Sequence, residues 1–192
     1  MSLIVSMMQA GITLLFLIFL YSCGEYFPDT NIVTESEFQD MTAAIDPGVS
    51  LELAEQRQLS ITDVRYDLYL IVPDDVDSAL TGRVAIDFLL SGATQPLVFD
   101  FKAPADHVSA VSVDGQEVQF SQPEDHILIP AEFASAGQHR VEIEFQATDA
   151  ALNRQQDFFY ALFVPDRAST AFPVFEQPNI KAKFNLTLDI PQ

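Results

Sequence analysis

Basic residues are scarce in this sequence. It contains 9 Lys and Arg against 28 Asp and Glu, and its formal net charge is −19. Nucleic-acid binding requires a clustered basic surface that meets the phosphates, and electrostatic binding to anionic lipid headgroups requires the same. The composition therefore argues against nucleic acid as a partner and against adhesion to a membrane through surface charge.

Cysteine is nearly absent and tryptophan is absent. Cys23 is the single cysteine, so no internal disulfide can form. The three histidines, His107, His126 and His139, are widely spaced and have no cysteine nearby. Zinc ligands usually come as a close pair plus a distant residue. We therefore expect surface or strand-edge histidines rather than metal ligands.

Motifs of enzymatic chemistry are also missing. The sequence has no H-E-x-x-H zinc motif, no G-x-S-x-G nucleophile turn and no glycine-rich phosphate loop. The run from Asp74 to Asp77 is similar to the start of a calcium loop but lacks the glycine and the distal glutamate of that motif. No catalytic residue, metal ligand or cofactor is therefore predicted on this chain.

Residues 1–22 form a long apolar stretch without a charged side chain. Within it, the apolar run Ile12–Leu20 is interrupted only by Thr13. This run is short for a transmembrane helix, which needs about 20 apolar residues, but its length suits the hydrophobic part of a signal peptide. It ends in Leu20-Tyr-Ser-Cys23-Gly24, which resembles a bacterial lipobox. The alternative is an N-terminal membrane helix with an incidental cysteine.

The lipobox resemblance implies that residues 1–22 are a lipoprotein signal peptide and that Cys23 is the lipid attachment site. Stable anchoring takes two acyl chains or an equivalent second signal, and bacterial lipidation supplies them. The expected location is the bacterial cell envelope, with the protein lipid-anchored to a membrane and facing an extracytoplasmic space.

Residues 23–49 show no helical or strand periodicity, and their charged side chains are all acidic. They are interpreted as an acidic tether that ends at Pro47-Gly48. Ser50 then suits the N-cap of a short helix over 51–58. The folded domain is expected to span residues 50–192.

From Ile61 onward, apolar and polar residues alternate. In the first segment Val64, Tyr66 and Leu68 alternate with charged residues, as is typical of a half-buried strand. Asp114-Gly115 favours the positive φ angles of a type I′ hairpin turn. About eight strands are expected, over 61–72, 82–91, 97–101, a hairpin within 108–120, 126–130, 139–147, 158–164 and 181–190. The predicted fold class is mostly β, an antiparallel β-sandwich.

The most specific signal is the segment A-S-T-A-F-P-V-F-E-Q-P-N-I-K-A-K-F, from Ala168 to Phe184. It resembles the segment A-R-x-x-F-P-C-F-D-[EQ]-P-x-x-K-A-x-F that closes the N-terminal domain of the aminopeptidase N-like zinc metallopeptidases. The resemblance extends over Ser50 to Gln192, because several upstream strands are similar as well. These are Ile61–Leu68, Gly82–Ile86, Leu97–Asp100, Val111–Gly115 and Gly137–Phe145.

Two prolines, Pro173 and Pro178, fix φ and stiffen this segment. Phe172 and Phe175 are either core residues or part of a docking surface, and Asn179 is expected to cap a helical turn at 180–182. The resemblance implies that the segment is a hinge to a following domain. The residues assigned to this domain-interface motif are Phe172, Pro173, Phe175, Glu176, Pro178, Lys181 and Ala182.

In the family, this saddle-like domain precedes a thermolysin-like catalytic domain with an H-E-x-x-H motif and a G-x-M-E-N loop. Neither motif occurs in this sequence. The resemblance therefore implies a non-catalytic domain that caps the peptide cleft of a catalytic zinc-peptidase domain or subunit. Zinc is expected only in that catalytic domain, and this chain by itself is expected not to hydrolyse peptides.

The sequence departs from the family pattern at Ser169, Val174 and Glu176, where the family has Arg, Cys and Asp. The family glutamate that binds the substrate amine falls at a valine here, so that role is not carried over. Asp166 either substitutes for the glutamate or is an ordinary turn carboxylate. The candidates for cleft-facing residues are Phe163, Val164 and Asp166.

Three functions remain open. The first is a surface-anchored partner of a catalytic domain, and the second is a stand-alone lipoprotein module that binds protein or peptide. The third, an unrelated carbohydrate-binding sandwich, is disfavoured by the missing tryptophan. A contiguous exposed apolar patch around Phe163, Phe172 and Phe175 would favour the first, and a polar or covered face there would favour the second.

Overall fold

The computed structural model describes residues 46–92 and 95–191. The predicted signal segment, the lipid attachment site at Cys23 and most of the acidic tether lie outside these residues. Over the two described ranges, no helix combines the length and the hydropathy needed to cross a bilayer.

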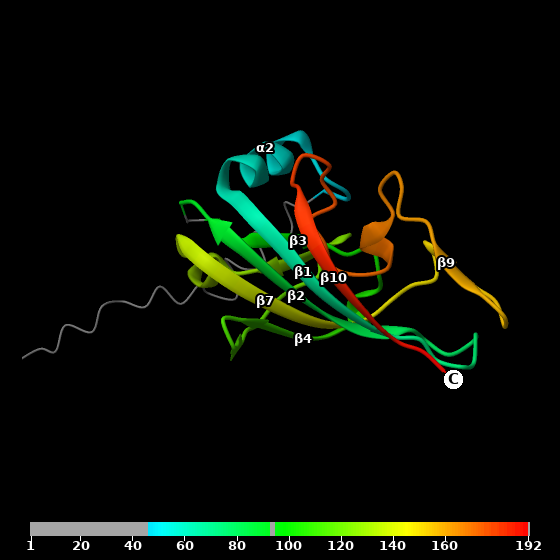
Figure 1. The fold of residues 1–192 in the computed structure, drawn as a ribbon. Helices are drawn as coiled ribbons and strands as arrows, with labels where there is room; N and C mark the ends of the chain where they lie inside the picture. The colour runs from blue at the N-terminus through cyan, green and yellow to red at the C-terminus, as the bar shows by residue number, and fades with distance from the viewer. Residues whose placement is uncertain (1–45, 93–94, 192) are drawn as a thin grey trace, which may run out of the picture. The chain divides into compact units, whose positions relative to one another are not determined.

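Six strands form the larger sheet, in the order β10-β1-β2-β7-β4-β5 (Figure 1). Neighbouring strands are antiparallel except β1 and β10, which run parallel with Tyr66 opposite Phe184. β10 is therefore an edge strand. The strands are β1 Ile61–Ile71, β2 Thr81–Leu90, β4 Val108–Val113, β5 Gln116–Glu117, β7 Gly137–Gln146 and β10 Ala182–Asp189.

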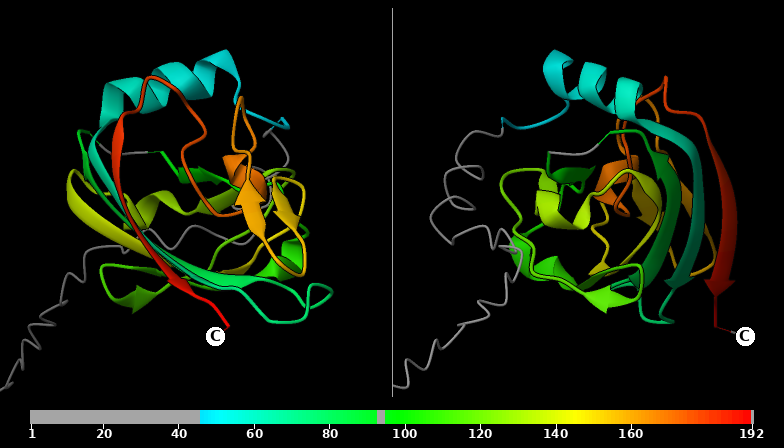
Figure 2. Two further views of the ribbon diagram at one scale, coloured as in Figure 1. Left: turned by 45° about the vertical axis from the view of Figure 1, so that its right-hand side comes forward. Right: turned by 90° about the vertical axis from the view of Figure 1, so that its left-hand side faces the viewer.

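Two strand pairs complete the β structure. β3 (Leu97–Asp100) pairs with β6 (His126–Ile129), and β8 (Leu152–Arg154) pairs with β9 (Phe159–Ala161). Figure 2 shows these strands on the inner side of the larger sheet and the helix α2 (Leu51–Ser60) across one end of the layers. Short 3-10 helices cover Ala105–His107, Ala131–Phe133 and Ala168–Thr170.

The core lies between the larger sheet and the β3–β6 pair. In β1 the alternating residues Val64, Tyr66, Leu68 and Leu70 are buried, as the sequence pattern predicts. The same alternation places Val84, Ile86 and Phe88 of β2 and Val141, Ile143 and Phe145 of β7 in one cluster with Phe99 and Ile127 from the second layer. Because each strand turns one side toward this cluster, the mostly β sandwich predicted from the sequence is confirmed.

Local expectations are met in two places. Ser50 caps α2 by accepting a hydrogen bond from the Leu53 amide at 3.1 Å. Asp114 and Gly115, which join β4 and β5, have φ values of 52° and 83°, so the predicted hairpin turn forms. The helix itself continues to Ser60, two residues beyond the predicted end.

Other expectations need correction. β8 was not predicted, because its three residues, two of them with polar side chains, show no clear alternation. The helical turn predicted after Asn179 is wrong. The Ile180 amide instead bonds to the Gln177 carbonyl at 3.1 Å in a reverse turn, because Pro178 fixes φ at its second position and β10 begins soon afterwards.

Candidate functional site

The hinge motif predicted from the sequence begins inside the core. Phe172 and Phe175 are each only 4% exposed, and Pro173 and Val174 are buried with them. The Phe175 ring stacks on Phe99 with centroids 4.8 Å apart. Phe172 and Phe175 are therefore core residues, and neither supplies a docking surface by itself.

The later motif residues approach the surface. Glu176 and Ala182 are half-buried, whereas Pro178 and Lys181 are exposed. The Glu176 carboxylate accepts a hydrogen bond from the Ser169 amide at 2.6 Å. The family places an arginine at the position of Ser169, and here the backbone of that buried residue binds the carboxylate.

A buried carboxylate, Asp100 at the end of β3, holds the motif against the sandwich. Its Oδ2 accepts a hydrogen bond from the Glu176 amide at 2.7 Å, and its backbone forms an isolated antiparallel bridge with Val174. The adjacent Phe175 amide donates to the Tyr66 hydroxyl at 3.0 Å. Burial raises the pKa of that hydroxyl far above its ordinary value, so Tyr66 acts as a neutral acceptor.

Arg57 of α2 supplies the charge that balances Asp100. Its Nη1 and Nη2 lie 2.8 and 2.7 Å from the two carboxylate oxygens, and Nη2 also donates to the Val98 carbonyl. The two side chains are 3% and 2% exposed. The guanidinium carbon lies 5.4 Å from the centroid of the Phe175 ring. α2 is thereby fastened to β3 and to the motif at once.

His126, at the start of β6, completes this buried cluster. Its Nδ1 lies 2.9 Å from Oδ1 of Asp100, and its Nε2 lies 2.9 Å from the Gly48 carbonyl. Burial works to lower the pKa of His126, but the contact and the charge of Asp100 outweigh burial and raise it above the ordinary value. Burial also works to raise the pKa of Asp100, yet His126 and Arg57 hold it below the usual range.

The prediction of surface or strand-edge histidines is therefore wrong for two of the three. His126 is fully buried, and His139 is 6% exposed. The Nδ1 of His139 lies 2.8 Å from the Asp114 carboxylate and its Nε2 lies 2.6 Å from the Ser135 carbonyl. The partner of His126, Asp100, is buried with it, whereas the Asp114 and Ser135 partners of His139 are exposed. In the described part of the chain, no three His, Cys, Asp or Glu side chains are grouped to hold a metal ion.

Exposed apolar side chains gather on two segments near the C-terminus. In 158–164 alternate residues are exposed, while Phe159, Ala161 and Phe163 between them pack on the core. In β10 all residues from 183 to 189 are exposed, and apolar side chains alternate with polar ones. Scattered exposed apolar residues are ordinary in soluble proteins, but two alternating rows are not. We name this set the exposed apolar surface: Phe158, Tyr160, Leu162 and Val164, with Phe184, Leu186, Leu188 and Ile190.

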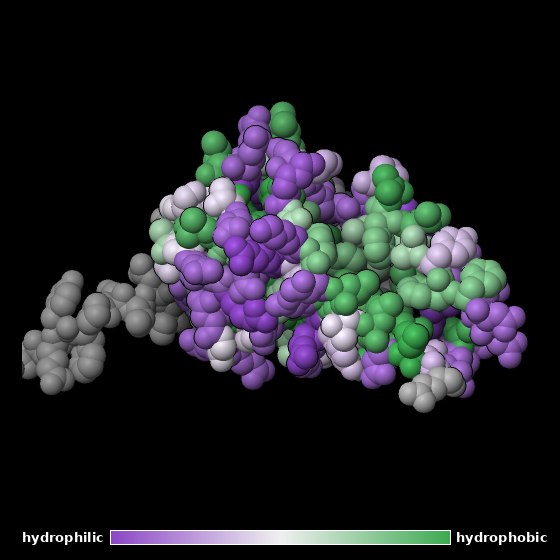
Figure 3. Space-filling model, in the orientation of Figure 1, coloured by the Kyte–Doolittle hydropathy of each residue, from purple (hydrophilic) through white to green (hydrophobic). Residues whose placement is uncertain are grey.

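Figure 3 shows hydrophobic residues gathered on the side of the domain that carries β9 and the lower part of β10, whereas hydrophilic residues dominate the opposite side of the same view. Aromatic contacts join this surface to the core, because Phe172 meets Phe163 at 5.5 Å and Phe184 at 6.2 Å between ring centroids. The exposed apolar surface is thus an uncovered extension of the core.

The three candidates for cleft-facing residues lie beside this surface. Val164 is 81% exposed and belongs to it, whereas Phe163 is half-buried. The Asp166 carboxylate lies 3.5 Å from the Lys102 ammonium in an exposed ion pair. Val164 stands at the position of the family glutamate. Among the three candidates, Asp166 alone carries a carboxylate, and that carboxylate is already paired with Lys102.

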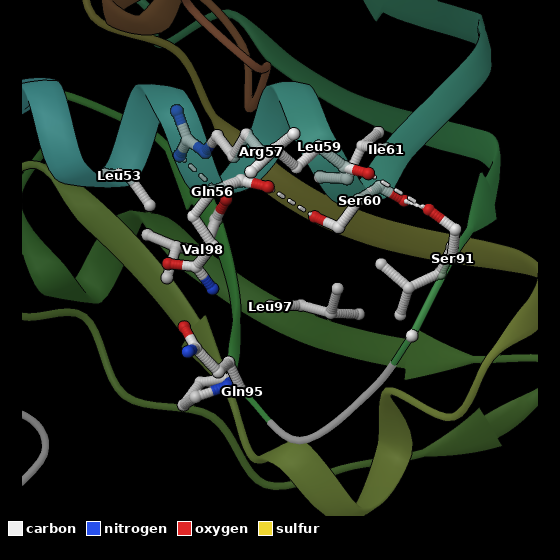
Figure 4. Close-up of a pocket in the computed structure, with 13 residues that line it drawn as sticks. Leu53, Gln56, Arg57, Leu59, Ser60, Ile61, Ser91, Gln95, Leu97 and Val98 are labelled. Atoms are coloured by element: carbon white, nitrogen blue, oxygen red, sulfur yellow. Dashed lines mark hydrogen bonds between the residues drawn. The ribbon is translucent and has the colours of Figure 1, made fainter.

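A cavity of about 330 Å³ lies beside α2 (Figure 4). Its polar groups are engaged within the wall: the Ser60 hydroxyl donates to the Gln56 carbonyl, the Ser91 hydroxyl to the Leu59 carbonyl, and Arg57 to Val98. Arg57 is the ionisable residue that lines it, and its guanidinium is already bound to Asp100. The cavity therefore offers no pair of acid and base groups for catalysis.

Sequence reasoning missed the buried cluster of Arg57, Asp100 and His126. Its signals were a charged residue ending the apolar run L-V-F-D and a histidine opening H-I-L-I-P. A charge in such a run indicates a paired, buried group. The sequence could not indicate that a helix more than forty positions upstream supplies the partner.

Comparisons with known proteins agree with this fold, although no protein-family model matches the sequence. A curated relative is aminopeptidase M1 of Arabidopsis thaliana, 28% identical over 157 residues; the match covers 66% of this chain and 17% of the relative. Native leukotriene A4 hydrolase of Saccharomyces cerevisiae superposes with a TM-score of 0.58 at 20% identity, over 68% of this chain and 23% of that chain.

The M1 zinc metallopeptidase of Deinococcus radiodurans superposes with a TM-score of 0.53 at 21% identity, over 67% of this chain and 32% of that chain. The chain thus spans a minor part of each of these proteins. The resemblance drawn from the segment Ala168–Phe184 is confirmed: the chain is similar in sequence to an aminopeptidase, and the described residues share the fold of the N-terminal region of M1 zinc metallopeptidases.

Proposed function

We propose that the chain is the non-catalytic N-terminal domain of a surface-anchored zinc aminopeptidase-like protein, and that it docks on the catalytic domain through the exposed apolar surface. The observation that carries this proposal is the pair of apolar rows on 158–164 and 184–190. The second row lies on β10, the last described strand, from which a following domain would continue.

The physical argument is that water contact with these side chains is unfavourable. Removing apolar area from water contributes about 25 cal/mol per Å². In the proposed complex, the catalytic domain covers the two rows while the opposite, hydrophilic side stays in solvent (Figure 3). Because Phe163 touches both this surface and buried Phe172, the surface is held by the core and needs little ordering on docking.

The catalytic domain supplies the chemistry in this proposal. The sequence lacks H-E-x-x-H and G-x-M-E-N, and the residues around the cavity beside α2 form no acid–base pair. The contribution of this chain is to cap one side of the peptide cleft. Val164, Leu162 and Phe163 give that side an apolar character where the family has a glutamate.

Anchoring through Cys23 completes the proposal. The domain would stand on a bacterial membrane at the end of the acidic tether, facing an extracytoplasmic space. Mass spectrometry of the mature protein tests this step. Diacylglycerol on Cys23 as the first residue is expected, and an unprocessed N-terminus would contradict it.

The transcript beyond the codon for Gln192 tests the docking proposal. A frame that continues there, or a separate gene of the same organism, is expected to encode a domain with H-E-x-x-H and G-x-M-E-N. Absence of any such domain from that genome would overturn the proposal. It would leave a stand-alone lipoprotein module that binds protein or peptide.

A further inference from the structure

We propose that His126 is a pH-sensitive latch that fastens the segment from Asp46 to Ser50 to the sandwich. This inference concerns the described domain itself and does not depend on the proposed function.

Both nitrogens of the His126 ring lie close to oxygen atoms. Nδ1 lies 2.9 Å from Oδ1 of Asp100, while Nε2 lies 2.9 Å from the Gly48 carbonyl and 3.2 Å from the Asp46 carbonyl. All three partners are acceptors, and a neutral imidazole carries a single N–H. The ring is fully buried, so solvent does not screen its contact with the Asp100 carboxylate. The protonated imidazolium is the form that places a positive charge beside Asp100 while Nε2 donates to the carbonyls.

His126 links the segment before α2 to the motif before β10. On one side it holds the carbonyls of Asp46 and Gly48, just before Ser50, which caps α2. On the other side it holds Asp100, which binds Arg57 of α2 and the amide of Glu176. His126 and Asp100 together therefore connect the segment that leads into the domain with the motif that leads into β10.

The charges that face His126 come from several elements. Asp100 of β3 favours the protonated ring, and Arg57 of α2 opposes it. Glu176 directs its amide at Asp100 and its carboxylate at Ser169, while the Tyr66 hydroxyl stays neutral. The Asp46 group that meets the ring is its carbonyl.

Loss of the His126 proton removes the positive charge beside Asp100 and leaves a single N–H for the oxygen atoms on the two sides of the ring, whereas Asp100 stays paired with Arg57 in two-point contact. The sandwich therefore stays folded, and the loss falls on the carbonyls of Asp46 and Gly48. The pKa of the folded ring lies above the ordinary histidine value. The latch is consequently closed at mildly acidic pH and opens as the pH rises through the folded pKa.

Nuclear magnetic resonance on the full chain provides the first test. The ring nitrogen shifts of His126, assigned by comparison with His126→Gln, report its titration between about pH 5 and 9. Amide exchange over residues 48–56 is measured across the same pH range. It is expressed as protection factors, because these correct for the intrinsic pH dependence of exchange. Between the ordinary and the folded pKa, protection is expected to fall about tenfold per pH unit, because opening releases one proton.

His126→Gln should abolish this pH dependence. His139→Gln is the matched control, since His139 is also buried between a carboxylate and a carbonyl but contacts neither α2 nor the 46–50 segment; it should leave the dependence unchanged. A His126 ring that titrates at or below the ordinary pKa, or protection over 48–56 that ignores its titration, overturns the proposal. If His126→Gln fails to fold, the proposal is still tested by the titration of His126 and the amide protection over 48–56 in the unmodified chain.

Discussion

The ring of Phe184 in β10 stacks on the ring of Tyr66 in β1, with centroids 4.4 Å apart and planes 6° apart. Tyr66 is 2% exposed, whereas Phe184 is 52% exposed. The pair marks the boundary at which the inner face of the larger sheet passes from core to surface. β10 continues the apolar pattern of β1 on the same face, but the described residues leave it largely uncovered.

This boundary predicts a large loss of stability on substitution at one of two paired positions and a small change at the other. Leu68 of β1 is opposite Leu186 of β10, and only Leu186 is exposed. Leu68→Ala should lower the free energy of unfolding by about 2–5 kcal/mol, because it leaves a cavity. Leu186→Ala should change it by no more than about 0.5 kcal/mol. Urea unfolding measures both, and equal losses would mean that β10 is covered within the domain.

Phe175→Ala should destabilise the fold by about 3–5 kcal/mol. The ring contacts Phe88, Phe99 and the Arg57 guanidinium, so its removal leaves a cavity beside a buried ion pair. From the sequence alone a docking role for Phe175 was open. A loss below about 1 kcal/mol, read from urea unfolding midpoints, would contradict the core assignment.

Removal of Arg57 should be costly, because the buried Asp100 carboxylate loses its two-point partner and keeps only the contact with His126. Arg57→Met is expected to lower the free energy of unfolding by about 3–5 kcal/mol. Arg65→Met is the control, since Arg65 pairs with Asp63 in an exposed ion pair and should change stability by less than about 1 kcal/mol. Similar thermal unfolding curves for the two variants would contradict the role of the cluster.

The same cluster sets a pH window for stability. The folded pKa of His126 is raised above 6.5, so its contribution is complete below pH 6.5 and is lost as pH rises through the folded pKa. The folded pKa of Asp100 is lowered below 3.8, so its contribution is present above pH 3.8 and is lost as pH falls through the folded pKa.

Urea midpoints measured from pH 4 to 9 should show this window as a difference between the unmodified chain and His126→Gln. The difference is expected to be largest below pH 6.5 and to shrink above it. Subtracting the variant removes the general effect of the acidic net charge. A difference that grows with rising pH would have the wrong sign for a raised pKa.

The fold was largely predictable because the alternation in residues such as Val64 and Tyr66 is local. One face of a strand is buried, and a period of two shows it directly. The hairpin at Asp114-Gly115 was predictable for the same reason, since two adjacent residues supply the required φ values. The segment Ala168–Phe184 identified the domain type because its spacing is long and intact.

The buried cluster and the exposed apolar surface were less predictable, because both depend on tertiary placement. His126 opens a strand in the sequence, and only its approach to Asp100 and Gly48 makes it a buried cation. Leu186 and Leu68 have the same alternating pattern, yet β10 extends past the covering layer and β1 does not. The pattern indicates which face is apolar, not whether anything covers it.

Docking through the exposed apolar surface can be measured by calorimetric titration of the domain with the catalytic zinc-peptidase domain from the same organism. A 1:1 complex with a negative heat-capacity change is expected. The double substitution Leu162→Asp and Leu186→Asp should weaken it at least about tenfold, or 1.4 kcal/mol. Leu59→Asp, which changes a still more exposed leucine on α2, should leave the affinity unchanged. No complex, or equal weakening by Leu59→Asp, would contradict docking through the exposed apolar surface.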